Sequence, residues 1–334
     1  MKLTVLLGGT SSERNVSLAS GLRMGAALRE AGHDVRLLDP ATGEIDAATE
    51  ATLAARGVGA EPPTQEALRA LLAADGTPML ATHPLVRDAD CVVLALHGGR
   101  GEDGTVQALL DLAGVPYTGS GAMATAVALD KDLTKRLLRH AGVPTAEWRM
   151  APIDADAAIA ALGLPLIVKP NREGSTVGLS VVKRREDLDA AIALAARYDR
   201  EVMVEAFVAG RELTVPVLAG RALPVGEIIA AKEIYDYECK YTPGMAREEF
   251  PAALDAATTA RVQRAAEDGY RALKLRGCAR LDFRLAPDGT LACLEANTLP
   301  GMTALSLVPQ SAAAAGIGFA DFCRSLVDDA LASR

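Results

Sequence analysis

The stretch KLTVLLGGTSSERNVSLASGLRMGAALREAGHDVRLLD, residues 2–39, decides the fold class. Its hydrophobic pattern predicts a buried strand, a Gly-rich loop, a helix and a second strand, at residues 2–7, 8–17, 16–32 and 33–39. A strand–helix–strand order of this kind is typical of a parallel sheet with helices against it. We therefore expect an α/β fold, with a further strand within 88–98 and a helix at 105–114.

Length and charge exclude several classes of protein. The chain has 334 residues, which is too many for one compact core and predicts two or three domains. Its net charge of −8, without a long basic run, argues against nucleic acid as the main partner. No apolar run approaches the ~20 residues of a membrane span, and the apolar start is too short for a signal peptide. We therefore expect no membrane association and no secretion.

The five cysteines are scattered along the chain without a CxxC pair. They are Cys91, Cys239, Cys278, Cys293 and Cys323. This spacing fits neither a disulfide framework nor a zinc site, and it is typical of a protein in a reducing cytosol. The expected location is therefore the cytoplasm.

The second part of the chain predicts strands, helices and one long loop. A helix is expected at 122–141, where Gly142 and Pro144 stop it. Further strands are expected at 165–170, 179–184, 201–208 and 211–220, further helices at 186–197 and 254–274, and the loop at 234–244.

A hairpin is expected in CARLDFRLAPDGTLACLEAN, residues 278–297, with its turn at Asp288-Gly289. With a loop at 286–289, the expected register places Leu285 opposite Thr290, Asp282 opposite Cys293, and Arg280 opposite Glu295. Opposite side chains share a face of the sheet, and so do side chains two residues apart. One face would carry Arg280, Asp282, Glu295 and Asn297, and the other, apolar face Leu281, Phe283 and Leu294.

The polar face of this hairpin suits a metal ion. Three oxygen ligands beside a guanidinium fit Mg²⁺ with a phosphate, because Mg²⁺ prefers hard oxygen ligands. The alternative is an edge hairpin with a solvated, charged face. A register slip of one residue would put the two carboxylates on opposite faces, so the metal hypothesis depends on the turn.

Two further segments are candidates for holding a nucleotide. In VKPNREGSTVGLSVV, residues 168–182, Lys169 could reach a phosphate, and the amides of Gly174 and Ser175 could line an anion-binding concavity. The segment is not a Walker A loop, because it lacks GKS or GKT and no helix follows directly. The alternative is a hairpin with an ordinary polar turn.

In VMVEAFVAGRE, residues 202–212, the strand backbone could pair with an adenine edge. Glu205 or Glu212 could accept a hydrogen bond from ribose. An isolated surface glutamate is the alternative.

Two residues near strand ends are candidates for binding a substrate. The first loop lacks G-x-G-x-x-G spacing, which argues against a dinucleotide site. Glu13 either helps to cap the following helix or receives an ammonium group. His97 lies at the carboxyl end of a predicted strand, where ligands gather in open α/β sheets. The alternative for His97 is a hydrogen-bonded structural residue.

Taken together, several long segments occur in the order typical of one family. They are LLGGTSSERNVSLASG, ALHGGRGEDGTVQALLDLAGVPYTGSG, ALDKDLTK, VKPNREGSTVG, YDYECKY, RLDFRL and LEANTLPGMTALSLVP. The chain resembles the ATP-grasp superfamily, and within it the D-alanine–D-alanine ligase family, nearly end to end. The resemblance is weakest at residues 41–86.

The resemblance implies an N-terminal parallel-sheet domain, α/β in class, followed by a two-lobed ATP-grasp fold of α+β character. The implied boundaries are 1–120 for the N-terminal substrate-binding domain, 121–203 for the central ATP-grasp lobe and 204–334 for the C-terminal lobe. A mobile loop, 234–250, would act as a lid. The resemblance also implies a homodimer.

The implied activity is the ATP-dependent joining of two D-alanines into D-alanyl-D-alanine for peptidoglycan, with Mg²⁺ as cofactor. The carboxylate of one D-alanine attacks the γ-phosphate to give an acyl phosphate, and the amine of the second displaces phosphate. An acyl phosphate hydrolyses easily, so a lid must exclude water from the site.

Residue roles carry over from the family motifs. Glu13 would bind the ammonium of the first D-alanine with His97 beside it, and Ser306 and the Leu307 amide would bind the carboxylate of the second. Contacts with ATP are implied for Lys131, Lys169, Glu173, Ser175, Glu205, Ala206, Phe207, Val208, Glu212 and Lys240. Asp282, Glu295 and Asn297 would hold two Mg²⁺ ions, or Mn²⁺, and Arg280 and the Gly301 amide would stabilise the tetrahedral intermediate. Hydrogen bonds among Ser175, Tyr241 and Glu13 would close the loop.

Two positions depart from the common family pattern, and three alternative functions stay open. Thr176 replaces a frequent serine but keeps the hydroxyl, and Ala206 replaces a frequent lysine where the adenine contact is mainly backbone. The nearest alternative is a D-alanine–D-lactate or D-alanine–D-serine ligase, against which Tyr241 argues. The others are another ATP-grasp carboxylate–amine ligase and a catalytically silent nucleotide-binding regulatory protein.

Overall fold

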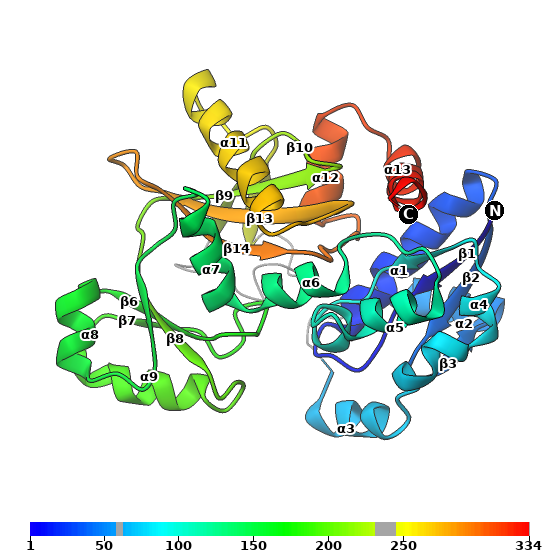
Figure 1. Ribbon diagram of the computed structural model, residues 1–334, viewed down its shortest axis with the longest axis horizontal. Helices are drawn as coiled ribbons and strands as arrows, with labels where there is room; N and C mark the ends of the chain where they lie inside the picture. Colours follow the sequence, from blue (N-terminus) through cyan, green and yellow to red (C-terminus); the bar gives the residue numbers. More distant parts are fainter. Residues whose placement is uncertain (58–62, 231–244, 334) are drawn as a thin grey trace.

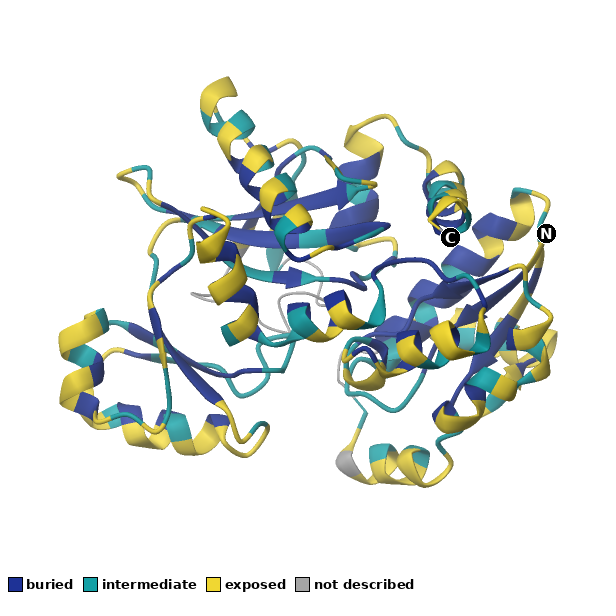
Figure 2. Cartoon of the chain, in the orientation of Figure 1, coloured by how far each residue is buried: buried dark blue, intermediate teal, exposed yellow. Residues whose placement is uncertain are grey.

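The structure is a computed structural model, and it describes residues 1–57, 63–230 and 245–333. Across these residues three β-sheets follow one another, each with helices packed against it (Figure 1). Figure 2 shows the strands as mainly buried and the outer faces of the helices as exposed. In the described part of the chain, no helix is both long and apolar enough to cross a membrane.

The first sheet is the parallel sheet that the sequence predicts. Its strand order is β3–β2–β1–β4; β1 runs parallel to β2 and β4, and β3 pairs antiparallel with β2. The strands span Lys2–Leu6 (β1), Asp34–Asp39 (β2), Gly43–Ile45 (β3) and Cys91–Leu94 (β4). Leu3 and Val5 pack in one core with α1, and Leu6 packs in another with α5, so β1 is buried on both faces.

Helices accompany this sheet, and α2, α3 and η1 lie in the region 41–86, which the sequence left largely unassigned. They span Arg14–Glu30 (α1), Ala47–Arg56 (α2), Gln65–Ala73 (α3), Pro84–Arg87 (α4) and Thr105–Ala113 (α5), with 3₁₀ helices at Thr77–Thr82 (η1) and Gly99–Gly101 (η2).

The second sheet, which we call the large sheet, is antiparallel. Its order is β12–β11–β9–β13–β14, with β10 beside β9. The strands span Arg211–Leu218 (β9), Arg221–Ala222 (β10), Gly226–Ala230 (β11), Ala246–Glu249 (β12), Cys278–Leu285 (β13) and Leu291–Asn297 (β14). Helices α6 (Ala122–Leu129), α7 (Lys131–His140), α11 (Ala256–Ala272) and α12 (Leu307–Ala314) pack against it.

The third sheet, which we call the small sheet, has the antiparallel order β5–β8–β6–β7. Its elements span Trp148–Met150 (β5), Ala155–Leu162 (α8), Leu166–Pro170 (β6), Ser180–Val182 (β7), Arg185–Asp187 (η3), Leu188–Ala195 (α9) and Val202–Ala206 (β8). Leu166 and Val168 pack in the core formed with α8 and α9, whereas Ile167 and Lys169 line a pocket on the other face. The alternation of β6 therefore separates core from site.

The predicted register of the hairpin 278–297 is wrong, although its main consequence holds. The Ala286 N–H donates to the Thr290 carbonyl at 2.8 Å, so three residues form the turn, and Leu285 pairs with Leu291. An irregularity between Asp282 and Phe283 then shifts the pairing by a further residue, as a β-bulge does. The resulting pairs are Asp282 with Glu295 and Arg280 with Asn297, so these four share a face. Leu294 is the exception, because it lines the pocket rather than the apolar face.

Two other expectations are corrected. The helix predicted at 122–141 is two helices, because the Asp130 side chain accepts a hydrogen bond from the Leu133 N–H at 3.0 Å and caps a new helix. The loop expected at 234–250 includes strand β12, which pairs with β11; residues 231–244 lie outside the described residues.

The C-terminal helix α13 (Phe319–Ala332) returns to the first sheet (Figure 1). It packs against α1 and β4, and Phe322, Leu326 and Val327 lie in one core with Leu3 and Val5. This packing crosses the expected boundaries 1–120, 121–203 and 204–334, which stay a prediction.

Candidate active site

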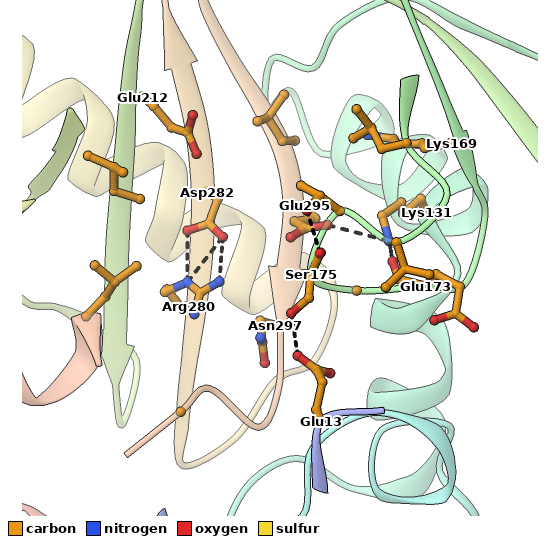
Figure 3. Close-up of a pocket in the computed structure, with 18 of the residues that line it drawn as sticks. Glu13, Lys131, Lys169, Glu173, Ser175, Glu212, Arg280, Asp282, Glu295 and Asn297 are labelled. Atoms are coloured by element: carbon orange, nitrogen blue, oxygen red, sulfur yellow. Dashed lines mark hydrogen bonds and ion pairs between the residues drawn. The ribbon is translucent and has the colours of Figure 1, made fainter. Parts of the chain in front are cut away.

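A single pocket contains every predicted site residue that the structure describes. The large sheet, the small sheet and the loops of the first sheet form its walls (Figure 3). It is lined by Glu13, His97, Lys131, Lys169, Glu173, Ser175, Glu205, Ala206, Phe207, Val208, Glu212, Arg280, Asp282, Glu295, Asn297, Gly301, Ser306 and Leu307. Lys240 and Tyr241 lie outside the described residues. The cavity volume of this pocket is about 220 Å³.

Two lysines from different elements face this pocket. Lys131 begins α7; its Nζ donates to the Glu173 carbonyl at 2.6 Å and lies 3.5 Å from Glu295 Oε2. Lys169 lies on β6, and its Nζ is 2.7 Å from Glu205 Oε2. The pocket therefore has two ammonium groups beside the loop that follows β6, and such a pair suits a polyanion.

A third lysine, Lys135, was missed by the sequence reasoning. Its Nζ is 2.5 Å from Glu205 Oε1, and its side chain is fully buried. Burial alone would raise the pKa of Glu205, but Lys169 and Lys135 together hold that pKa below its usual value. The available signal was spacing, since Lys131 and Lys135 are four residues apart and share a helix face.

The end of β8 forms a mainly apolar slot. Ala206, Phe207 and Val208 line it, together with Ile167, Leu179, Ile228 and Leu294. Arg284, also missed, donates from Nε to the Val208 carbonyl and from Nη1 to Glu212 Oε2, each at 3.0 Å. An apolar slot of this kind suits a planar base, with Glu212 at its edge.

The polar face of the β13–β14 hairpin has the chemistry of a metal site. Asp282 lies opposite Glu295, with Asn297 on the same face (Figure 3). Arg280 donates from Nη2 to Asp282 Oδ2 at 2.8 Å, and Thr214 donates to Asp282 Oδ1 at 2.7 Å. Among the described residues no three His, Cys, Asp or Glu side chains form a metal-binding group, so the third ligand would be the amide oxygen of Asn297. Two carboxylates and an amide are hard oxygen donors, and they fit Mg²⁺.

Glu13 and Ser175 join the first sheet to the small sheet. Ser175 Oγ donates to Glu13 Oε1 at 2.5 Å (Figure 3). Glu13 occupies the N-cap position of α1, but its side chain makes no capping hydrogen bond, so capping does not explain it. Ser175 and Thr176 both have left-handed backbones, with φ of 49° and 60°. Strain of this kind is typical of loops held in a functional position.

His97 is buried, and both of its ring nitrogens are hydrogen-bonded. Nδ1 is 2.7 Å from the Leu299 carbonyl and Nε2 is 3.1 Å from Ser20 Oγ, which also accepts from the Met302 N–H. Burial lowers the pKa of His97, which favours the neutral ring with its proton on Nδ1. His97 therefore anchors the loop that carries Gly301, as its structural alternative predicts, and it also lines the pocket; a role beside a substrate stays a prediction.

Two further residues, Arg23 and Glu102, lie near the loops that carry the predicted substrate-binding residues of the site. Arg23 donates from Nη1 to the carbonyls of Met302 and Thr303, each at 2.9 Å. Glu102 lines the pocket, and burial, followed by the negative charge of Glu13, raises its pKa to about 8. Neither residue was identified from the sequence.

Ser306 and Gly301 meet at the start of α12. Ser306 Oγ accepts from the Thr303 N–H at 3.0 Å, and a Cβ on Gly301 would come within 2.8 Å of the same oxygen. Only glycine fits there without displacing Ser306. Ser306 is the N-cap of α12 and Leu307 its first residue, so the helix N-terminus opens toward the pocket wall and favours an anion.

Protein-family models match both parts of the chain: "D-ala D-ala ligase N-terminus" over residues 2–120 and "D-ala D-ala ligase C-terminus" over residues 137–328. A D-alanine–D-alanine ligase from Anaeromyxobacter sp. (strain Fw109-5) is 42% identical over 333 residues, which cover 98% of this chain and 96% of the relative. One from Cupriavidus taiwanensis is 44% identical over 327 residues, covering 96% and 89%.

Solved structures share the whole architecture. The D-alanine–D-alanine ligase from Bacillus anthracis complexed with ATP has a TM-score of 0.77 at 30% identity, covering 100% of this chain and 98% of that chain. The VanG D-Ala:D-Ser ligase from Enterococcus faecalis has a TM-score of 0.80 at 28% identity, covering 98% of each chain.

The fold is thus a parallel-sheet N-terminal part followed by a two-lobed ATP-grasp fold, as predicted. Within that class, the chain belongs to the D-alanine–D-alanine ligase family, and the resemblance inferred from its sequence is confirmed.

Proposed function

We propose that this protein is an ATP-dependent ligase that joins two D-alanines into D-alanyl-D-alanine for peptidoglycan synthesis. The observation that carries the proposal is the convergence of the family's site residues, from all three sheets and their loops, on one pocket. In the reaction, the carboxylate of the first D-alanine attacks the γ-phosphorus of ATP and ADP leaves. The amine of the second D-alanine then attacks the acyl carbon of the D-alanyl phosphate, and phosphate leaves.

The nucleotide lies between the two ATP-grasp sheets. Adenine occupies the slot at Ala206, Phe207 and Val208, with Glu205 at its edge and Glu212 at the ribose. Lys131 and Lys169 contact the phosphates, next to the loop of Glu173 and Ser175. Phosphoryl transfer depends mainly on positioning and charge neutralisation, and these two lysines contribute to both.

Asp282, Glu295 and Asn297 hold two Mg²⁺ ions, or Mn²⁺, which neutralise charge on the phosphate oxygens when bound. Arg280 and Thr214 both donate to Asp282 and position its carboxylate. Arg280 stabilises the charge that develops on oxygen at the reacting carbon.

The amino-acid substrates lie against the loops of the first sheet and α12. Glu13, held by Ser175 Oγ, binds the ammonium of the first D-alanine. Glu102, with its pKa raised to about 8, is largely protonated at neutral pH, so it adds little negative charge beside Glu13. The Gly301 amide supports the tetrahedral intermediate, and Ser306 with the Leu307 amide binds the second carboxylate.

Two roles that the family motifs imply fall on residues outside the described part of the chain. From those motifs we propose that Lys240 contacts the γ-phosphate and that Tyr241 hydrogen-bonds with Ser175 and Glu13, which would exclude water from the acyl phosphate. We place the reaction in the cytoplasm, where ATP is available, and propose a homodimer. The elution mass of the purified protein, measured by light scattering, tests the dimer.

The main alternative concerns the second substrate, since a D-Ala:D-Ser ligase shares the fold at a TM-score of 0.80. The relatives at 42% and 44% identity favour D-alanine. Replacing Tyr241 tests the specificity argument: Tyr241→Phe is expected to raise the use of D-lactate relative to D-alanine. If the ratio of D-lactate use to D-alanine use stayed the same as in wild type across the pH range, that argument would fail.

The decisive experiment is ATP-dependent phosphate release with Mg²⁺, with product mass measured in parallel. D-alanine alone, L-alanine, D-alanine with D-lactate or D-serine, and no substrate are compared. Release with D-alanine alone and a D-alanyl-D-alanine mass support the proposal. Phosphate release only with D-lactate or D-serine present would mean that the second substrate is not D-alanine. No phosphate release under any condition would favour a catalytically silent nucleotide-binding protein.

A further inference from the structure

Glu205 is a buried carboxylate shared by two lysines. Its side chain is 2% exposed; Lys135 Nζ lies 2.5 Å from Oε1, and Lys169 Nζ lies 2.7 Å from Oε2. The three groups come from three elements, α7, β6 and β8. The cluster therefore has two positive charges around one negative charge, in a position where water screens little.

The two lysines differ in what they can reach. Lys169 lines the pocket, so an anionic ligand can draw its ammonium away from Glu205. Lys135 is fully buried behind the pocket wall; its Nζ also donates to Thr145 Oγ1 at 2.5 Å and lies 5.1 Å from the Trp148 ring centre. Thr145 Oγ1 donates to the Cys293 carbonyl on β14, which fixes this end of the network. No ligand in the pocket can therefore compete for Lys135 directly.

This difference decides the charge that the pocket presents. Lys135 by itself is enough to neutralise the charge of Glu205. The positive charge of Lys169 can therefore interact with a ligand. Without Lys135, Lys169 and Glu205 would cancel each other. A phosphate that drew Lys169 away would then leave a buried, unpaired carboxylate, which is strongly unfavourable.

We propose that Lys135 is a positioning residue for nucleotide binding: as the permanent counter-ion of Glu205, it leaves the Lys169 ammonium available to the phosphates. The inference rests on the proposed function, because it assumes that the polyanion in the pocket is a nucleotide. Lys135 acts through Glu205 and Lys169 and does not touch the ligand. The lowered pKa of Glu205 agrees with a carboxylate that stays charged when Lys169 moves.

The test separates phosphate binding from base binding. Dissociation constants for ADP with Mg²⁺ and for adenosine are measured by calorimetry on the full chain, for wild type and Lys135→Met. The ADP affinity should fall roughly 10-fold or more, the size of one charge-assisted contact, whereas the adenosine affinity should change less than about 3-fold. Lys183→Met, which removes an exposed lysine, is the matched control and should change neither.

A second substitution tests the charge argument itself. Adding Glu205→Gln to Lys135→Met removes the carboxylate that Lys169 would otherwise neutralise. The ratio of ADP to adenosine affinity should then return to that of the Glu205→Gln single variant, within about 2-fold. If Lys135→Met does not fold, the comparison of these two variants carries the test alone, and a persistent difference in the ratio overturns the proposal.

The failure of this inference is distinct from failure of the proposed function. Equal losses of ADP and adenosine affinity in a folded Lys135→Met variant would mean that Lys135 only supports packing, and would overturn the inference alone. A wild-type protein that binds neither ADP nor adenosine would overturn the proposed function and the inference with it.

Discussion

The contact between Ser175 and Glu13 predicts the cost of removing one hydroxyl. Ser175 Oγ donates to Glu13 Oε1 at 2.5 Å and is the described link from the β6–β7 loop to the residue proposed to bind the substrate ammonium. A hydrogen bond to a charged group contributes ~1.5–3 kcal/mol, and the partial exposure of Glu13 places this one near the lower end. Since ~1.4 kcal/mol is a factor of ten, Ser175→Ala should raise KM for D-alanine roughly 10-fold.

The backbone of Ser175 supplies a matched second variant. Its φ of 49° is left-handed, a conformation that costs a non-glycine residue ~1–3 kcal/mol. Ser175→Gly also loses the hydroxyl, but it relieves this strain. Both variants should therefore share the rise in KM, whereas Ser175→Gly should have the higher melting temperature.

The assay is phosphate release against D-alanine concentration at saturating ATP, with melting curves for each variant. A double-mutant cycle with Glu13→Gln isolates the contact, and a coupling energy of ~1.5 kcal/mol is expected. KM within 2-fold of wild type for Ser175→Ala, or no coupling in the cycle, would refute the reasoning.

Three further changes have defined outcomes. Glu295→Gln should reduce turnover and raise the half-saturating Mg²⁺ concentration by ~10-fold or more, measured by titrating Mg²⁺ at fixed ATP; near-normal activity would refute the metal assignment. Glu102 has a pKa raised to about 8, so the stability it contributes is present at low pH and is lost as pH rises through about 8. The melting temperature of Glu102→Gln should therefore rise relative to wild type between pH 5 and 9, and parallel curves would contradict this. His97 has a pKa lowered by burial, so stability is full above its ordinary pKa of ~6.5 and is lost as pH falls through the lowered value. His97→Gln should show a shallower loss of melting temperature than wild type from pH 8 to 5, and an equal loss would mean that His97 does not titrate there.

Local patterns were sufficient to predict much of the fold. The apolar run before the Gly-rich loop predicted β1 and its parallel sheet, because a strand covered on both faces needs no polar positions. Motif residues such as Lys169 and Asp282 were predicted for one site, and they line one pocket. Their individual roles stay predictions.

The remainder depended on interactions that a local pattern does not contain. The turn of the hairpin is one residue shorter than predicted, and the bulge beside Asp282 returns Asp282 and Glu295 to the same face of the sheet. Neither feature can be recognised from an alternation of polar and apolar residues. In the sequence pattern, Asp130 looks like one more residue of a continuous helix. Only the structure shows that its side chain caps α7. Lys135 resembles any helical lysine, because its partner Glu205 is 70 residues away in sequence.

The return of α13 to the first sheet has a consequence for how the protein is made. Leu3 and Val5 on β1 are among the first core residues to be synthesised, and their core is completed by Phe322 and Val327 among the last. Until then, the apolar face of α1 that α13 covers has no cover, and exposed surface of this kind favours aggregation. The N-terminal part should thus complete folding only after the entire chain has been synthesised, and a fragment of residues 1–120 should be poorly soluble on its own.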